Sequence, residues 1–191
     1  MQALKIPRYT EAEYLEFDAT HEGRHEYVNG EILAMAGASF AHLRLASNAM
    51  IGLGRALTGR PGVPYAADLR VAIDETGLYA YPDITVVCGA PELAPTAPET
   101  LLNPTVLIEV LSEITASYDR GEKLEHYRRR ASVQAVVLID SRERRVTVVS
   151  RNADATWTIT DAVQGAVTVP GIDVVLELDE LYAGVGFGAD G

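Results

Sequence analysis

The chain has few of the features that extracellular and membrane proteins need. Its 191 residues include a single cysteine, Cys88, so no intramolecular disulfide can form. No apolar run reaches the roughly 20 residues of a membrane-spanning helix, and the first residues lack the long apolar stretch of a signal peptide. We therefore expect a cytoplasmic protein without membrane association, with Cys88 as a small buried core residue.

Basic residues are scarce. The chain has 16 Lys and Arg against 27 Asp and Glu, and its formal net charge is −11, which argues against a generic nucleic-acid binder. The shortage is uneven, because residues 120–151 hold nine basic and four acidic residues, a local net charge of +5. Such a segment is compatible with polyanion binding, although charge runs are more often solvated faces.

Apolar residues, in contrast, are plentiful. They make up 48% of the chain, which is enough for one well-packed domain. Their spacing predicts a turn feeding a strand at 27–35, strands at 65–73, 81–88, 105–111, 133–140, 145–150 and 157–160, and helices at 10–15, 39–57, 119–130 and 176–182. Thr10 with Glu13 and Asp119 with Glu122 are the expected capping boxes of the first and third helices, and Ser39 is the expected cap of the second. Residues 89–104, with four prolines, are expected to form a long loop. This order indicates an α/β (α+β) fold with a central mixed sheet flanked by helices.

Two of the predicted strands each carry one carboxylate in an apolar run: Asp83 after Tyr81-Pro, and Glu109 within Val106-Leu-Ile-Glu-Val-Leu. A buried ionised carboxylate is costly unless a cation pairs with it, and hard divalent cations prefer oxygen ligands. If the strands pair, the two carboxylates could share a magnesium ion. Alternatively, Asp83 caps a turn after Pro82, and Glu109 forms an ion pair with an arginine such as Arg70.

The order of these motifs resembles the restriction-endonuclease-like PD-(D/E)xK superfamily and, more narrowly, its Uma-type family of endonucleases. The resemblance covers nearly the whole chain and rests on Glu26-Tyr-Val-Asn-Gly-Glu31, Ser39-x-x-His42, Asp68-Leu-Arg-Val, Tyr81-Pro-Asp83, Ile108-Glu109-Val-Leu-Ser112, Asp119, Lys123 and Tyr127. It implies a restriction-endonuclease-like domain over residues 1–183, followed by a flexible glycine-rich tail at 184–191. The implied activity is hydrolysis of DNA with Mg²⁺ or Mn²⁺, by a homodimer.

The resemblance also implies roles for single residues. Asp83 and Glu109 would be the metal ligands, with a main-chain carbonyl near Val110 as a third oxygen. The superfamily lysine is missing, because Leu111 stands two residues after Glu109. Lys123 on the following helix would replace it, orienting the attacking water or stabilising developing charge; the alternative is an ordinary exposed helix lysine.

Two further candidates for the catalytic site come from the same resemblance. Glu31 would be an additional acidic ligand, or else a charge that protects a strand edge from pairing. His42 would support the metal ligands or act as a base, or else be a core histidine with a satisfied ring.

We therefore predict a Mg²⁺-dependent DNA endonuclease with Asp83, Glu109, Lys123, Glu31 and His42 at its site. The alternative function is a non-catalytic nucleic-acid-binding or regulatory module that kept the fold, as the acidic composition and the missing lysine favour. A third possibility is an interaction protein whose carboxylates only pair with arginines.

Overall fold

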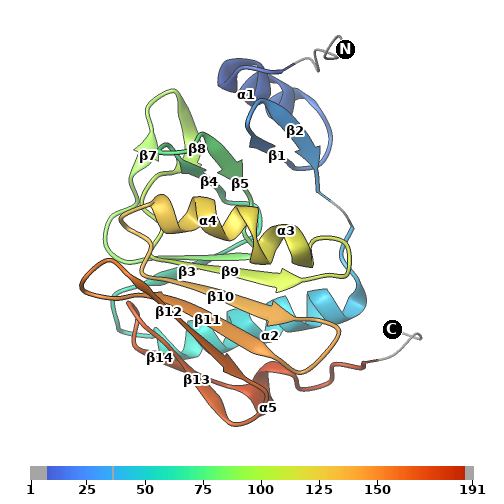
Figure 1. The fold of residues 1–191 in the computed structure, drawn as a ribbon, viewed down its shortest axis with the longest axis vertical. Helices are drawn as coiled ribbons and strands as arrows, with labels where there is room; N and C mark the ends of the chain where they lie inside the picture. Colours follow the sequence, from blue (N-terminus) through green and yellow to red (C-terminus); the bar gives the residue numbers. More distant parts are fainter. Residues whose placement is uncertain (1–7, 36, 188–191) are drawn as a thin grey trace, which may run out of the picture.

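Two six-stranded mixed sheets and a small hairpin form the framework of the protein (Figure 1). The computed structural model describes residues 8–35 and 37–187. The N-terminal sheet has the order β2-β1-β5-β4-β8-β7, with β1 His25–Val28, β2 Glu31–Ala34, β4 Arg70–Ile73, β5 Leu78–Ala80, β7 Leu93–Ala94 and β8 Ala97–Leu101. The main sheet has the order β12-β11-β10-β9-β6-β3, with β3 Val63–Ala66, β6 Ile84–Val87, β9 Val106–Leu111, β10 Ala135–Asp140, β11 Val146–Arg151 and β12 Trp157–Ala162. The expected mixed α+β class is confirmed, with two sheets in place of one central sheet.

Helices cover both faces of the main sheet. They are α2 Phe40–Ala56, with the short α5 Leu178–Leu181 beside it, and α3 Ala116–Arg120 and α4 Glu122–Arg129, whereas α1 Glu11–Thr20 packs beside β1 of the N-terminal sheet. Helix α2 packs on one face with the hairpin β13 (Ala166–Val169) and β14 (Val174–Glu177), and α3 and α4 lie on the other face (Figure 1). No helix within residues 8–35 and 37–187 is long and apolar enough to cross a membrane.

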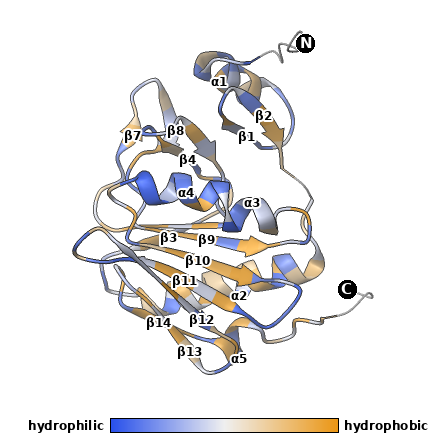
Figure 2. Cartoon of the chain, in the orientation of Figure 1, coloured by the Kyte–Doolittle hydropathy of each residue, from blue (hydrophilic) through white to orange (hydrophobic). Residues whose placement is uncertain are grey.

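Strand β9 is buried on both of its faces. Val106, Ile108 and Val110 point into the core shared with α2, whereas Leu107 and Leu111 point into the core under α4. A strand covered by helices on both sides reads as a continuous apolar run, and Figure 2 shows β9 and β10 as largely hydrophobic. Because side chains alternate along a strand, Glu109 lies on the α4 side.

Helix α2 and helix α1 begin where the sequence predicts. The Ser39 hydroxyl accepts a hydrogen bond from the His42 N–H at the start of α2. Thr10 and Glu13 form the predicted capping box of α1. These local signals need no tertiary context, because each satisfies backbone N–H groups that a helix start leaves free.

Several predicted elements are divided differently in the structure. The strand expected at 65–73 is two strands in different sheets, separated by a turn at residues 67–69 that lacks glycine or proline as a signal. The expected loop at 89–104 contains β7 and β8, and residues 176–182 begin as a strand before α5. Strands β1, β5 and β13 were not predicted. In the tail expected at 184–191, residues 184–187 carry no helix or strand, and 188–191 lie outside the described residues.

The helix expected at 119–130 is broken at Gly121 into α3 and α4. The predicted capping box at Asp119 is absent, because the cap of α4 is Gly121 and has no side-chain hydrogen bond. Asp119 is free to point elsewhere, and the break changes the direction from which α4 presents its side chains.

A buried polar network joins α1 to the N-terminal sheet. Asp18 accepts hydrogen bonds from Arg70 (2.8 Å) and from the Tyr81 hydroxyl, and Arg70 also donates to Thr100 (2.8 Å). Although burial opposes ionisation of Asp18, the bonds from Tyr81, from the His25 N–H and from Arg70 hold its pKa below the ordinary value. Arg70 therefore forms its ion pair with Asp18.

We expect Arg70→Met to destabilise the protein by about 3 kcal/mol, because it leaves the Asp18 carboxylate buried without its cation. The matched control is Arg24→Met, which breaks the exposed Arg24–Asp68 pair (3.3 Å) and is expected to cost less than about 1 kcal/mol. Urea unfolding measures both. Equal losses for the two variants would show that the Asp18 network does not hold the N-terminal sheet.

Candidate functional site

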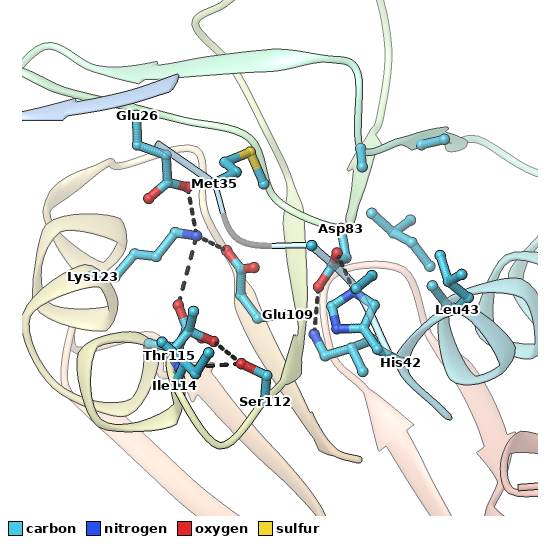
Figure 3. Close-up of a pocket in the computed structure, with 18 of the residues that line it drawn as sticks. Glu26, Met35, His42, Leu43, Asp83, Glu109, Ser112, Ile114, Thr115 and Lys123 are labelled. Atoms are coloured by element: carbon cyan, nitrogen blue, oxygen red, sulfur yellow. Dashed lines mark hydrogen bonds and ion pairs between the residues drawn. The ribbon is translucent and has the colours of Figure 1, made fainter. Parts of the chain in front are cut away.

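Asp83 and Glu109 face each other across two neighbouring strands. Strands β6 and β9 are antiparallel, and the register Ile84↔Ile108, continued by one residue, brings Asp83 opposite Glu109. Directly opposed side chains on one face of an antiparallel pair have Cβ atoms about 5 Å apart. Both carboxyl groups line the same cavity (Figure 3).

The printed pairing of these strands ends at Ile84, and Pro82 stands just beyond it. The N–H of Val110 donates to the Asp83 carboxylate (2.7 Å). Peptide groups alternate in direction along a strand, so the Val110 carbonyl points toward β6 as that of Ile108 does. The residue opposite Val110 in the continued register is Pro82, which has no N–H to donate. Strand geometry therefore predicts the Val110 carbonyl on the same side as the two carboxylates.

Lys123 reaches the same site from α4. Its ammonium lies 2.9 Å from Glu109, 2.8 Å from Glu26 and 3.7 Å from Asp119 (Figure 3). All four residues are buried, with Lys123 only 4% exposed. Tyr127, one turn further along α4, donates its hydroxyl hydrogen to the same Glu109 oxygen (2.6 Å). The buried ammonium is thus surrounded by three carboxylates from three parts of the chain.

Burial and neighbouring charges together set the protonation states of Glu109 and Lys123. It raises the pKa of Glu109 to about 8, even though the Lys123 ammonium opposes this and favours the ionised form. Burial alone would lower the pKa of Lys123, but Glu109, Glu26 and Asp119 together raise it well above its usual value. Lys123 is therefore protonated throughout the physiological range.

His42 supports Asp83 from the start of α2. Its Nε2 lies 2.9 Å from the Asp83 carboxylate. Burial would lower the pKa of His42, but the hydrogen bond and charge of Asp83 outweigh it and raise the pKa. Because Asp83 is bonded by both His42 and Val110, its carboxyl plane is fixed.

The arginines of residues 120–151 take little part in this site. Six of the eight are paired with acids elsewhere: Arg120 and Arg142 with Asp140, Arg128 with Glu125, Arg130 with Asp74 and Glu75, Arg144 with Asp179, and Arg145 with Glu143. A seventh, Arg151, donates to main-chain carbonyls. Among the described residues, no arginine lines the cavity. The local positive charge of the sequence is therefore largely balanced by neighbouring carboxylates.

A family model described as "Uma2: Putative restriction endonuclease" matches residues 11–180. The chain belongs to the Uma2 family. Two similar proteins come from Synechocystis: the uncharacterized protein sll1609, 32% identical over 152 residues (80% of this chain and 86% of the relative), and the uncharacterized protein slr1290, 28% identical over 183 residues (95% of each).

The fold of this Uma2 protein also matches a solved structure. A crystal structure from Anabaena variabilis, described as a putative nuclease belonging to a family of domains of unknown function, superposes with a TM-score of 0.73. The match covers 90% of this chain and 96% of that one at 20% identity. At this identity the likeness establishes the fold, which is consistent with a restriction-endonuclease-like protein.

Four of the five predicted site residues of this Uma2 protein lie together: Asp83, Glu109, Lys123 and His42 all line one cavity of about 570 Å³. Glu31 does not line it; it is exposed on β2. Its place near Lys123 is taken by Glu26 on β1, which the sequence reasoning left out of the site. Glu26 lacks the signal that marks Glu109, because His25 precedes it and only Tyr27 and Val28 follow it before the turn at Asn29-Gly30.

The alternatives considered for the two carboxylates are not observed. The cation beside Glu109 is Lys123, whereas Arg70 binds Asp18. The N–H that reaches Asp83 belongs to Val110 on the neighbouring strand, not to a residue of the turn after Pro82. Both acids therefore owe their positions to the pairing of β6 with β9.

The oxygen set fits a hard divalent cation. Within residues 8–35 and 37–187, no three His, Cys, Asp or Glu side chains are placed to hold a metal ion by themselves. Mg²⁺ does not need such a group, because it keeps several waters and is usually held by one or two carboxylates together with substrate phosphate oxygens. Asp83, Glu109 and the Val110 carbonyl match that smaller donor set.

We expect the stability of the metal-free protein to fall between about pH 5 and pH 8. The folded-state pKa of Glu109, about 8, is raised above its ordinary 4.5, so the folded protein binds this proton more tightly. The stabilisation that this proton gives the folded protein is complete below the ordinary Glu109 pKa of 4.5. It is lost as the pH rises through the folded-state pKa of about 8.

Glu109→Gln should flatten this dependence, because the amide cannot ionise, whereas the exposed Glu99→Gln should leave it unchanged. Urea unfolding in the presence of EDTA across this pH range measures the effect. A wild-type curve that is already flat, or that rises with pH, would contradict the raised pKa of Glu109.

Proposed function

We propose that this Uma2-family protein is an endonuclease that hydrolyses DNA phosphodiester bonds at Asp83 and Glu109 with Mg²⁺. The observation that carries the proposal is the meeting of two carboxylates on adjacent strands, beside a buried ammonium. Family membership supports a nuclease with a nucleic-acid substrate. Mn²⁺ would suit the same oxygen donors.

A metal is the expected partner of this site, because restriction-endonuclease-like nucleases generally use divalent ions. Asp83 and Glu109 would hold it, with the Val110 carbonyl as a third oxygen. When bound, it would polarise the phosphate and lower the pKa of a coordinated water.

The surrounding residues keep the site in one geometry. Lys123 is held by Glu26 and Glu109, so its ammonium is fixed where it can orient a water or stabilise charge on the phosphate. Tyr127 holds the Glu109 carboxyl from α4. His42 holds Asp83 from α2, and its raised pKa favours a cation near developing negative charge. Each group thus acts from a rigid element.

We further propose that the protein acts in the cytoplasm as a homodimer, so that two sites can act on the two strands of a duplex. Large apolar side chains on the outer surface of α2, Phe40 (65% exposed) and Ile51 (51%), support association of copies. Sedimentation equilibrium reports the state, and a monomer at working concentrations would remove this part of the proposal.

Asp83→Asn and Glu109→Gln should each reduce Mg²⁺-dependent DNA cleavage by at least about 100-fold, because each removes a metal ligand. Both substitutions keep the shape of the side chain, so the melting temperature should show that the fold is retained. Glu92→Gln, an exposed acid outside the cavity, is the control and should cleave as the wild type does. Cleavage that survives both site variants would exclude this pair as the catalytic centre.

Calorimetry separates the catalytic function from its alternative. The wild-type protein should bind Mg²⁺ at millimolar concentrations, and both site variants should bind it more weakly. A protein that binds DNA in a salt-sensitive manner but takes up no metal and cuts nothing would be a non-catalytic module. A protein that does neither would be an interaction protein.

A further inference from the structure

The cavity that contains the carboxylates also has a large apolar wall. Helix α2 contributes Leu43, Ala46 and Met50, the turn between β3 and β4 contributes Ala67, and Ile114 stands at the opposite side. Figure 3 shows Leu43 beyond Asp83 and Ile114 below Glu109, so that the polar floor and the apolar wall belong to one space. Cleavage of a phosphodiester alone gives no use for such a wall.

The carboxylates lie deep in this cavity. The side chain of Asp83 is 13% exposed and that of Glu109 is 6% exposed. A volume of about 570 Å³ is that of a pocket for a small molecule, which encloses most of its ligand. A paired DNA strand offers the phosphates on its outer surface while its bases stay stacked inside. It therefore has no apolar face to place beside the scissile phosphate.

An unpaired nucleotide has both features on one unit. Its base has a flat apolar face that packs against apolar or aromatic side chains, and its phosphate lies within the same residue. Enzymes that act on a base bind single strands or turn the nucleotide out of the duplex into a pocket. A site that places a base against an apolar wall beside the scissile phosphate has the same requirement. An apolar wall on α2 beside the carboxylates Asp83 and Glu109 therefore fits an unpaired nucleotide better than it fits the surface of a duplex.

Tyr118 adds an unexplained polar group beside the same cavity. Its hydroxyl is buried and has no hydrogen-bond partner among the residues that the structure describes, although Tyr118 lines the cavity. Burial raises the pKa of Tyr118, so the hydroxyl keeps its proton and remains a donor. A buried donor without a partner is uncommon. Because its oxygen is closed to solvent, the polar edge of a base would satisfy it only after the Tyr118 side chain turns toward the cavity.

We propose that this cavity binds one unpaired DNA nucleotide, with its base against the α2 wall and its phosphate at Asp83 and Glu109. The preferred substrate is accordingly single-stranded DNA or a duplex with an unpaired nucleotide. This inference rests on the proposed nuclease function and adds to it the form of the substrate.

Oligonucleotides of one sequence, labelled with 2-aminopurine at one position, test the substrate class. Three labelled substrates are incubated with Mg²⁺: a single strand, a perfect duplex, and a duplex in which the labelled nucleotide is a one-base bulge. A fourth is a single strand that has an abasic site in place of the label. We expect the single strand and the bulged duplex to be cut at least about tenfold faster than the perfect duplex. The abasic single strand should be cut at that position about tenfold more slowly than the intact single strand.

A variant that fills the pocket tests the wall itself. Ala46→Leu places extra volume against the base, whereas Ala131→Leu adds the same volume at an exposed position outside the cavity. With Ca²⁺ in place of Mg²⁺, binding of the labelled single strand is followed by 2-aminopurine fluorescence. Ala46→Leu should weaken strand binding at least about tenfold, while Mg²⁺ uptake and the melting temperature stay close to the wild-type values. Ala131→Leu should leave strand binding, Mg²⁺ uptake and the melting temperature unchanged.

The outcomes separate this inference from the proposed function. A perfect duplex cut as fast as the bulged one, or an abasic strand cut as fast as the intact one, overturns the nucleotide pocket and leaves the nuclease function standing. If no substrate is cut, the nuclease function fails. Strand binding that Ala46→Leu weakens would then still support the pocket, and equal binding by both variants would overturn it.

Discussion

The arrangement of the candidate site depends on one buried cation. Lys123 lies among Glu109, Glu26 and Asp119, and all four side chains are almost fully removed from water. Removing each charge from water costs several kcal/mol, and the ammonium offsets part of this cost for the acids. Glu109 avoids the rest by keeping its proton, since burial raises its pKa to about 8. The same contacts fix α4 against β9 and β1. One interaction thus joins the N-terminal sheet to the main sheet and at the same time sets the geometry at Glu109.

The sequence was most informative where local rules decide the structure. Ser39 and Thr10 cap their helices as predicted, and the apolar runs around Asp83 and Glu109 form neighbouring strands. The sequence was least informative where the structure of a segment depends on which strands it pairs with. Residues 65–73 alternate as one strand would, yet the two halves join different sheets. Periodicity reports that a segment is buried and extended, but not which strands it pairs with, because those contacts are distant in sequence.

The candidate site shows the same division. The acids at 83 and 109 stand out in the sequence, because a charge within an apolar run needs a partner. The position of Lys123 could not be derived from spacing, since it depends on the break at Gly121 and on where α4 packs. Glu26 and Glu31 are five residues apart on two strands of one hairpin, and only the fold decides that the first is buried beside Lys123 while the second is exposed.

The acidity of the protein constrains how a nucleic acid reaches this site. The cavity holds Asp83, Glu109, Glu26 and Asp119 against Lys123 and His42, and the nearby arginines are already paired with acids. Without further positive charge, this floor repels a phosphate. Any cation held by Asp83 and Glu109 removes that repulsion, and by linkage a bound phosphate strengthens the binding of the cation equally. Metal and nucleotide affinities are therefore coupled through the carboxylates. The apolar wall is independent of salt, so a strand held there loses less affinity as the ionic strength rises than one held by surface arginines.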